Sequence, residues 1–146
     1  MPTKDYSKYI NRNKTKPNYF INSFRAFIVG GSLGIIGQGL SDLYFIYFEL
    51  SRDNANSLML VTLILAASLL TGFGVLDTFG QFAGAGLFVP ITGFANSMTS
   101  AALEARSEGL VLGVAANMFK LAGAVITFGI VSAYIFGIIR VVFVGG

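Results

Sequence analysis

The chain has 146 residues, of which 54% are hydrophobic and only 12% are charged, and its mean hydropathy is +0.71. These values exclude an ordinary soluble domain, so we expect an all-α integral membrane protein. The chain contains no cysteine, histidine or tryptophan. This excludes disulfides, thiolate or imidazole catalysis and the usual zinc or haem ligands. We therefore expect neither an enzyme nor a bound cofactor or metal.

Basic residues are concentrated at the N-terminus. The first 25 residues hold six lysines and arginines against one aspartate, a net charge of +5, whereas the rest of the chain sums to −2. A basic flank directly before the first apolar segment favours the cytoplasmic side. Residues 1–23 are therefore predicted to form a cytoplasmic tail lying on an anionic leaflet. Nucleic-acid binding is a weaker interpretation, because the tail leads straight into lipid.

Residues 24–146 are predicted to form one transmembrane domain with about four hydrophobic segments. Because a bilayer core of ~30 Å needs roughly 20 helical residues, the uncharged stretches place spans at about 24–48 and 58–76. The first span contains Gly30 and Gly34, a spacing that lets helix backbones approach closely in lipid. We expect this helix to pack against another.

The segment 78–103, TFGQFAGAGLFVPITGFANSMTSAAL, is uncharged but does not have the pattern of an ordinary spanning helix. Its four glycines and Pro90 would destabilise a continuous helix by roughly 1 kcal/mol per glycine and about 3 kcal/mol for the proline. Broken backbone at membrane depth must be buried in protein or line a wet cavity. We therefore predict a broken or re-entrant segment, with a helix restarting near Ala95. Whether the segment crosses the membrane is left open.

The remaining residues offer one more confident span. A charged cluster at 104–108 marks an aqueous boundary, and the uncharged stretch 109–119 that follows is too short to span. It is predicted to form a short helix that ends at Lys120. Residues 121–139 then form the final span. The side reached by the C-terminus depends on whether 78–103 crosses.

The broken segment supplies the main functional candidates. Exposed carbonyls and amides at such a break could meet a permeating solute, whereas the alternative is that the glycines only allow close helix packing. Pro90 and the surrounding polar side chains favour the first interpretation. The candidates for a pore lining or solute path are Gln81, Gly84, Gly86, Pro90, Thr92, Gly93 and Asn96.

Two further groups of charged residues are candidates. Asp42, Asp77 and Lys120 are predicted to lie in or near the hydrocarbon, where an ionisable group is expensive and normally faces a cavity or a partner. The alternatives are that Asp77 only ends a helix at the interface and that Lys120 snorkels. The cluster Glu104, Arg106 and Glu108 is predicted to be a solvated loop or, alternatively, a contact for a partner.

Three stretches together resemble a known family. GQFAGAG (80–86), VPITGFANSMTSAALE (89–104) and SEGLVLGVAANMFKLAG (107–123) are similar to the stage V sporulation protein AC family of endospore-forming bacteria. The likeness extends from about residue 24 to residue 137. The sister AEb family shares much of the central pattern, but the basic tail and the length favour AC.

The resemblance implies a subunit of the spore inner-membrane channel. Such a channel would move dipicolinic acid with its calcium into the forespore and release it at germination, with membrane tension as a possible gating signal. The implied partners are the lipid bilayer, other membrane and soluble subunits of the same complex and further copies in an oligomer. The alternative is a non-conducting anchor or assembly subunit that recruits partners of that complex. The family provides no residue-level solute site.

Overall fold

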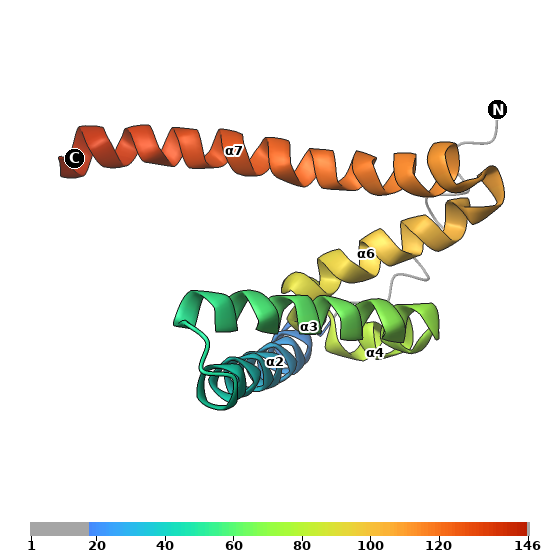
Figure 1. The fold of residues 1–146 in the computed structure, drawn as a ribbon, viewed down its shortest axis with the longest axis horizontal. Helices are drawn as coiled ribbons and strands as arrows, with labels where there is room; N and C mark the ends of the chain where they lie inside the picture. Colours follow the sequence, from blue (N-terminus) through green and yellow to red (C-terminus); the bar gives the residue numbers. More distant parts are fainter. Residues whose placement is uncertain (1–17, 146) are drawn as a thin grey trace.

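The computed structural model describes residues 18–145, and none of these residues lies in a β-strand. The expected all-α membrane fold is confirmed (Figure 1). In chain order the elements are α2 (Tyr19–Tyr47), α3 (Arg52–Gly72), α4 (Val75–Ala83), α5 (Ala85–Phe88), α6 (Ile91–Glu104), the 3-10 turn η1 (Ala105–Glu108), the π-helical turn η2 (Leu110–Ala115) and α7 (Ala116–Val144). Of the predicted tail, residues 1–17 lie outside the described residues.

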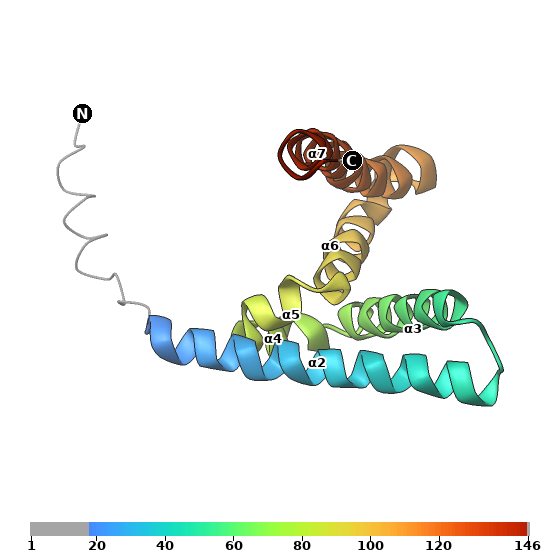
Figure 2. The same ribbon diagram turned by 90° about the vertical axis from the view of Figure 1, so that its left-hand side faces the viewer.

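The first two long helices, α2 and α3, form an antiparallel hairpin. The Ser51 side chain caps α3 by accepting a hydrogen bond from the backbone amide of Asn54, as a serine at this position commonly does. Gly37 of α2 lies against Met59 and Leu63 of α3, at distances where an added Cβ would make ordinary contact. Figure 2 shows α3 beside the second half of α2, while α4 and α5 lie beside its first half.

The predicted break in the segment 78–103 is present, and two residues account for most of it. Gly84 separates α4 from α5 with φ 54° and ψ −133°, a backbone conformation open mainly to glycine. Pro90, with φ −64°, directly precedes α6. The helix therefore restarts at Ile91 and not near Ala95, because proline cannot continue a helix but starts one well.

The chain returns after this break to the place where it left α3. Asp77, near the start of α4, accepts a hydrogen bond of 3.1 Å from the side-chain amide of Asn96 on α6. Thr71, at the end of α3, bonds the same Asn96 at 2.7 Å. Between these points the tip at Pro90 reaches the middle of α2, where it lines a cavity with Gly34. We infer that 78–103 dips to mid-membrane and returns to the same side.

Within residues 18–145, three helical stretches are long and apolar enough to cross a membrane: Tyr19–Tyr47, Arg52–Gly72 and Leu110–Phe143. The expected interruption at Lys120 is wrong, because the helix runs through it without a break. Lysine is a good helix former, so a charge alone does not end a helix. If all three cross and 78–103 returns to the same side, we expect the C-terminus on the side opposite the start of α2.

The last helix stands apart from the rest. Figure 1 shows α7 extending away from α6 at a distance from α2 and α3. None of the residues in its spanning window is buried. The core lies elsewhere and is made mostly of small or medium side chains, namely Val29, Ala67, Leu76, Ala83, Leu87 and Ala95. Small residues are what close packing in lipid requires, since lipid tails are as apolar as the side chains.

Candidate functional site

The broken segment 78–103, which we call the re-entrant hairpin, packs against the first half of α2 through a glycine. Gly86 of α5 is buried, and a Cβ added there would overlap the backbone of Ala26. Gly30, one helical turn further along α2, faces the same glycine, and its own added Cβ would lie 3.5 Å from the Gly86 Cα. Gly86 is therefore a packing residue, and its backbone faces α2.

Phe88 packs against glycines on both arms of the hairpin, although 43% of it is exposed. A Cβ added at Gly80 would overlap the Phe88 ring, and one added at Gly93 would overlap the Phe88 backbone. Thr92 is buried and donates a hydrogen bond of 2.7 Å to the Leu87 carbonyl oxygen, which satisfies one backbone acceptor at the break. Gly93 and Thr92 thus fold the hairpin back on itself.

A polar network holds the two ends of the hairpin together. Asn96 is buried, and its side chain links Thr71 of α3 with Asp77 of α4. Among the described residues, no buried side-chain nitrogen or oxygen lacks a partner. Asp77 therefore does not stand as an isolated intramembrane charge, since it has a hydrogen-bond donor on the facing helix.

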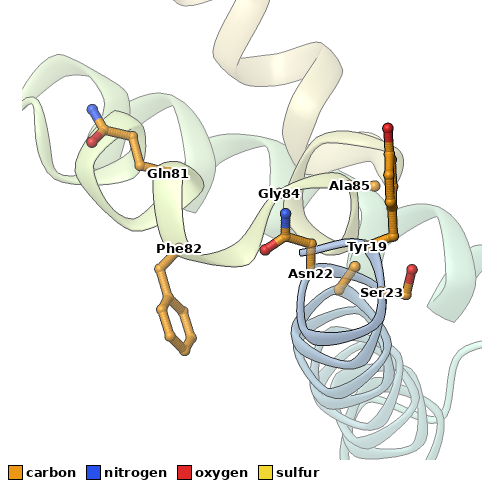
Figure 3. Close-up of a pocket in the computed structure, with 8 residues that line it drawn as sticks. Tyr19, Asn22, Ser23, Gln81, Phe82, Gly84 and Ala85 are labelled. Atoms are coloured by element: carbon orange, nitrogen blue, oxygen red, sulfur yellow. The ribbon is translucent and has the colours of Figure 1, made fainter. Parts of the chain in front are cut away.

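A cleft with a volume of about 310 Å³ opens between the start of α2 and the turn from α4 to α5 (Figure 3). We call it the hairpin cleft. Its lining is Tyr19, Asn22, Ser23, Ala26, Gln81, Phe82, Gly84 and Ala85. In Figure 3 the Asn22 amide points toward Gly84, and the Tyr19 ring stands beside Ala85. The Gln81 amide points away from Asn22.

One cation lies at the edge of this cleft. The Arg25 guanidinium sits over the Phe82 ring, 4.8 Å from its centroid, an arrangement in which the ring face attracts the positive charge. No residue that lines the hairpin cleft carries a carboxylate. Arg25 is not itself a lining residue, but it places a positive charge next to one, Phe82.

Asp42 lies at the other end of α2 and is paired. Its carboxylate accepts hydrogen bonds from Arg52 at 2.6 Å and from Gln38 at 3.0 Å. Arg52 also lies over the Phe45 ring, 4.0 Å from the centroid. Asp42 is thus part of the junction between α2 and α3 and does not approach the hairpin.

The remaining charged candidates lie near the end of α6 and the start of α7. Glu104, Arg106 and Glu108 are exposed around η1, as expected of a solvated turn, and Lys120 is exposed on α7. The two glutamates line a small cavity with Asn117. Across the described residues there is no group of three or more acidic side chains positioned to hold a metal ion.

Comparison with known proteins identifies the family. The family model described as SpoVAC/SpoVAEB sporulation membrane protein matches residues 22–139. The stage V sporulation protein AC of Bacillus subtilis (strain 168) is 56% identical over 140 residues, which cover 96% of this chain and 93% of that protein. The chain belongs to the SpoVAC/SpoVAEB family. No solved structure matches it.

Within this SpoVAC/SpoVAEB protein, the predicted solute-path residues separate into two groups. Gln81 and Gly84 line the hairpin cleft, and Pro90 and Thr92 line an apolar cavity against α2 and α3. These four residues form the cavity-lining group. The second group, Gly86, Gly93 and Asn96, serves the packing and hydrogen bonding of the hairpin, although Gly93 also lines another cavity with Pro90.

The sequence reasoning missed Asn22, Ser23 and Arg25. A signal was present, because these three polar residues fall together in the first two turns of the helix, ahead of a largely apolar stretch. Their relation to the hairpin could not be read from spacing, since about 60 residues separate them from Gln81 along the chain.

Proposed function

We propose that this protein of sporulation is a channel subunit for dipicolinic acid and its calcium chelate. The channel would lie in the spore inner membrane, take the solute into the forespore and release it during germination. It would be a passive conductor and not an enzyme. The proposal rests on membership of the sporulation family and on the geometry of the re-entrant hairpin.

The observation that carries the proposal is the glycine- and proline-broken hairpin seated against α2 at membrane depth. Irregular backbone within a membrane is tolerated where protein buries it or where it lines a water-filled cavity. Here the core of the hairpin is buried, while its Gln81–Gly84 turn borders the hairpin cleft. Channels use such elements to bring polar backbone to a solute path.

Membrane tension is the proposed gating signal. Gly86 meets Ala26 and Gly30 through backbone and small residues, and none of the side-chain hydrogen bonds among the described residues joins α5 to α2. A shift of α5 along α2 would therefore disturb apolar packing, including that of Leu87 and Val29 in the core, but would break no side-chain hydrogen bond between the two helices. Tension favours whichever state occupies more area in the membrane, and it shifts the population toward that state.

The conducting unit is proposed to be an oligomer that includes other subunits of the sporulation complex. The spanning window of α7 has no buried residue in a single copy, so the apolar surface of this helix is available to neighbours or lipid. If the path lies between several copies, the hairpin glycines do not have to line it. This would explain why they are packed within one copy.

Flux through liposomes tests the proposal. The cysteine-free chain allows a Gln81→Cys variant to be modified with a bulky maleimide, with Thr78→Cys, exposed on the same helix, as the matched control. We expect dipicolinate efflux or stretch-activated current that falls on modification of Gln81→Cys and persists on modification of Thr78→Cys. Equal inhibition of both variants, or no flux even with the partner subunits present, counts against the channel.

A non-conducting assembly subunit is the second candidate. It is favoured by the observation that the buried polar side chains of the described residues all have partners within one copy, which leaves no buried group waiting for a solute. In this case the exposed turn at Glu104, Arg106 and Glu108 would contact a soluble partner. Charge-neutral variants of these three residues should then abolish complex formation, whereas liposomes containing this chain alone should remain silent.

A further inference from the structure

We propose that the hairpin cleft is a binding site for the oxygens of a small organic anion, with Arg25 as its charged group. The inference rests on the proposed channel function and deepens it, because it identifies where an anionic solute would first be held. The ligand chemistry is a carboxylate or a phosphate. Two sources can supply it: a free dicarboxylate in solution or the headgroup of an anionic lipid.

The cleft has the size and lining of a small-molecule site. Its volume of about 310 Å³ lies at the lower end of the range of ligand pockets, ~300–1,000 Å³, which suits a ligand of about one ring. Tyr19 and Phe82 supply aromatic surface on two sides, and Asn22 and Ser23 supply polar groups from α2. This mixture of apolar walls and a few polar groups is typical of a site that orients its ligand.

The polar groups are available for a ligand. Within the described residues, the side chains of Asn22 and Ser23 form no hydrogen bond with each other, while the Gln81 amide points away from Asn22 (Figure 3). The Asn22 amide points toward Gly84, so a ligand in the cleft lies within its reach. An amide and a hydroxyl can each donate to an anionic oxygen without a change in protonation.

The positive charge of Arg25 next to the cleft favours an anionic ligand. Arg25 rests on the Phe82 wall, and no carboxylate lines the cleft. The one ion pair found among the described residues joins Arg52 to Asp42, at the far end of α2. The guanidinium has a planar array of donors that matches carboxylate and phosphate geometry. Its contact with Phe82 holds it at the edge of the cleft, where it can turn toward a bound anion.

Equilibrium dialysis of pyridine-2,6-dicarboxylate against purified protein in phosphatidylcholine nanodiscs tests the site. Arg25→Gln should weaken binding at least about tenfold, and Asn22→Leu by about fivefold. The matched control, Arg140→Gln, removes the same charge from an exposed position on α7 and should stay within about twofold. Arg25→Lys keeps the charge and should recover part of the loss. Circular dichroism verifies that each variant is folded.

A lipid arm of the experiment distinguishes the two sources. In nanodiscs with phosphatidylglycerol, a headgroup in the cleft would protect Gln81→Cys from a maleimide without added dicarboxylate and leave Thr78→Cys reactive. A free solute would protect it only when added. Either pattern supports the anion site. The anion site would be overturned by two results together. Arg25→Gln and Arg140→Gln would bind the dicarboxylate equally well, and phosphatidylglycerol would not change the protection of Gln81→Cys.

The outcome remains separable from that of the channel proposal. Flux that persists when Arg25→Gln no longer binds the dicarboxylate leaves the channel standing and removes the site from its path. Binding that depends on Arg25 in a protein that conducts nothing supports the site and contradicts the channel.

Discussion

The Asn96 amide on α6 donates a hydrogen bond of 3.1 Å to the Asp77 carboxylate on α4, across the base of the re-entrant hairpin. Asp77 lies at the start of the outgoing arm of the hairpin and Asn96 on the returning arm, so this bond joins the two arms. Asn96 also accepts from Thr71, which ties the base to the end of α3. The position and stability of the hairpin depend on this buried amide.

Replacing Asn96 with leucine should loosen the base of the hairpin. The change removes both Asn96 side-chain bonds, although Thr71 keeps its bond to the Ala67 carbonyl oxygen and Asp77 is exposed, so we expect a cost of about 1 kcal/mol. Asp77→Asn is the control, because its amide oxygen still accepts from Asn96, and it should cost less than half as much. Thermal unfolding in detergent, followed by circular dichroism, measures both. Equal stability of Asn96→Leu and wild type contradicts the role given to the network.

The close contact of α5 with α2 should leave no room for a side chain at Gly86. Gly86→Ala places a Cβ on the Ala26 backbone and should destabilise the protein by about 1–3 kcal/mol, as overpacking does. The control is Gly31→Ala, where no atom lies within 4 Å of the added Cβ and where helix propensity alone predicts a slight gain. Unfolding temperatures of the two variants should move in opposite directions.

If the hairpin is re-entrant, the side of the membrane that each turn faces can be predicted. Single cysteines at Asn18 and Ser107 should react with an impermeant maleimide from one side of a sealed vesicle. Cysteines at Ser51 and Gly145 should react from the other. All four positions lie outside the three spanning helices or at their ends. Labelling of Ser107 from the Ser51 side would show that 78–103 crosses the membrane.

Two polar contacts between α2 and α3 should differ in how much they contribute to the free energy of unfolding. Arg52→Gln breaks an exposed ion pair and should cost only about 0–1 kcal/mol. Ser41→Val should cost more, about 1–2 kcal/mol, because Ser41 is 1% exposed and donates a 2.6 Å hydrogen bond to Asn56. Urea or heat unfolding of the two variants provides the comparison, and the reverse order would contradict the weight given to burial.

The sequence predicted those features that a single residue type determines. Gly84 and Pro90 restrict the local backbone directly, so the break between 78 and 103 could be placed from composition. Its return to the same side could not, because it depends on the contact of Asp77 with Asn96, which are 19 positions apart. The interruption expected at Lys120 shows the limit of counting charges, since helix propensity and not charge decides whether the backbone continues.

The candidate site was predictable only in part for the same reason. Gln81 and Gly84 stand out within a glycine-rich stretch, but their partners Asn22 and Ser23 belong to another helix and are brought near only by the seating of α5 on α2. Asp42 was predicted to face a cavity or a partner, but the partner, Arg52, could not be named because the turn between them brings the two together in a way that spacing does not show.

The exposure of α7 divides the molecule into two parts with different dependence on their surroundings. Residues of α2 through α6 hold one another through glycine contacts and buried hydrogen bonds, whereas α7 meets the rest of its own chain mainly near its beginning. Loss of the far half of α7 should therefore leave the hairpin intact while removing the surface through which copies would recognise each other. Folding of the hairpin and assembly of the complex can then fail independently of each other.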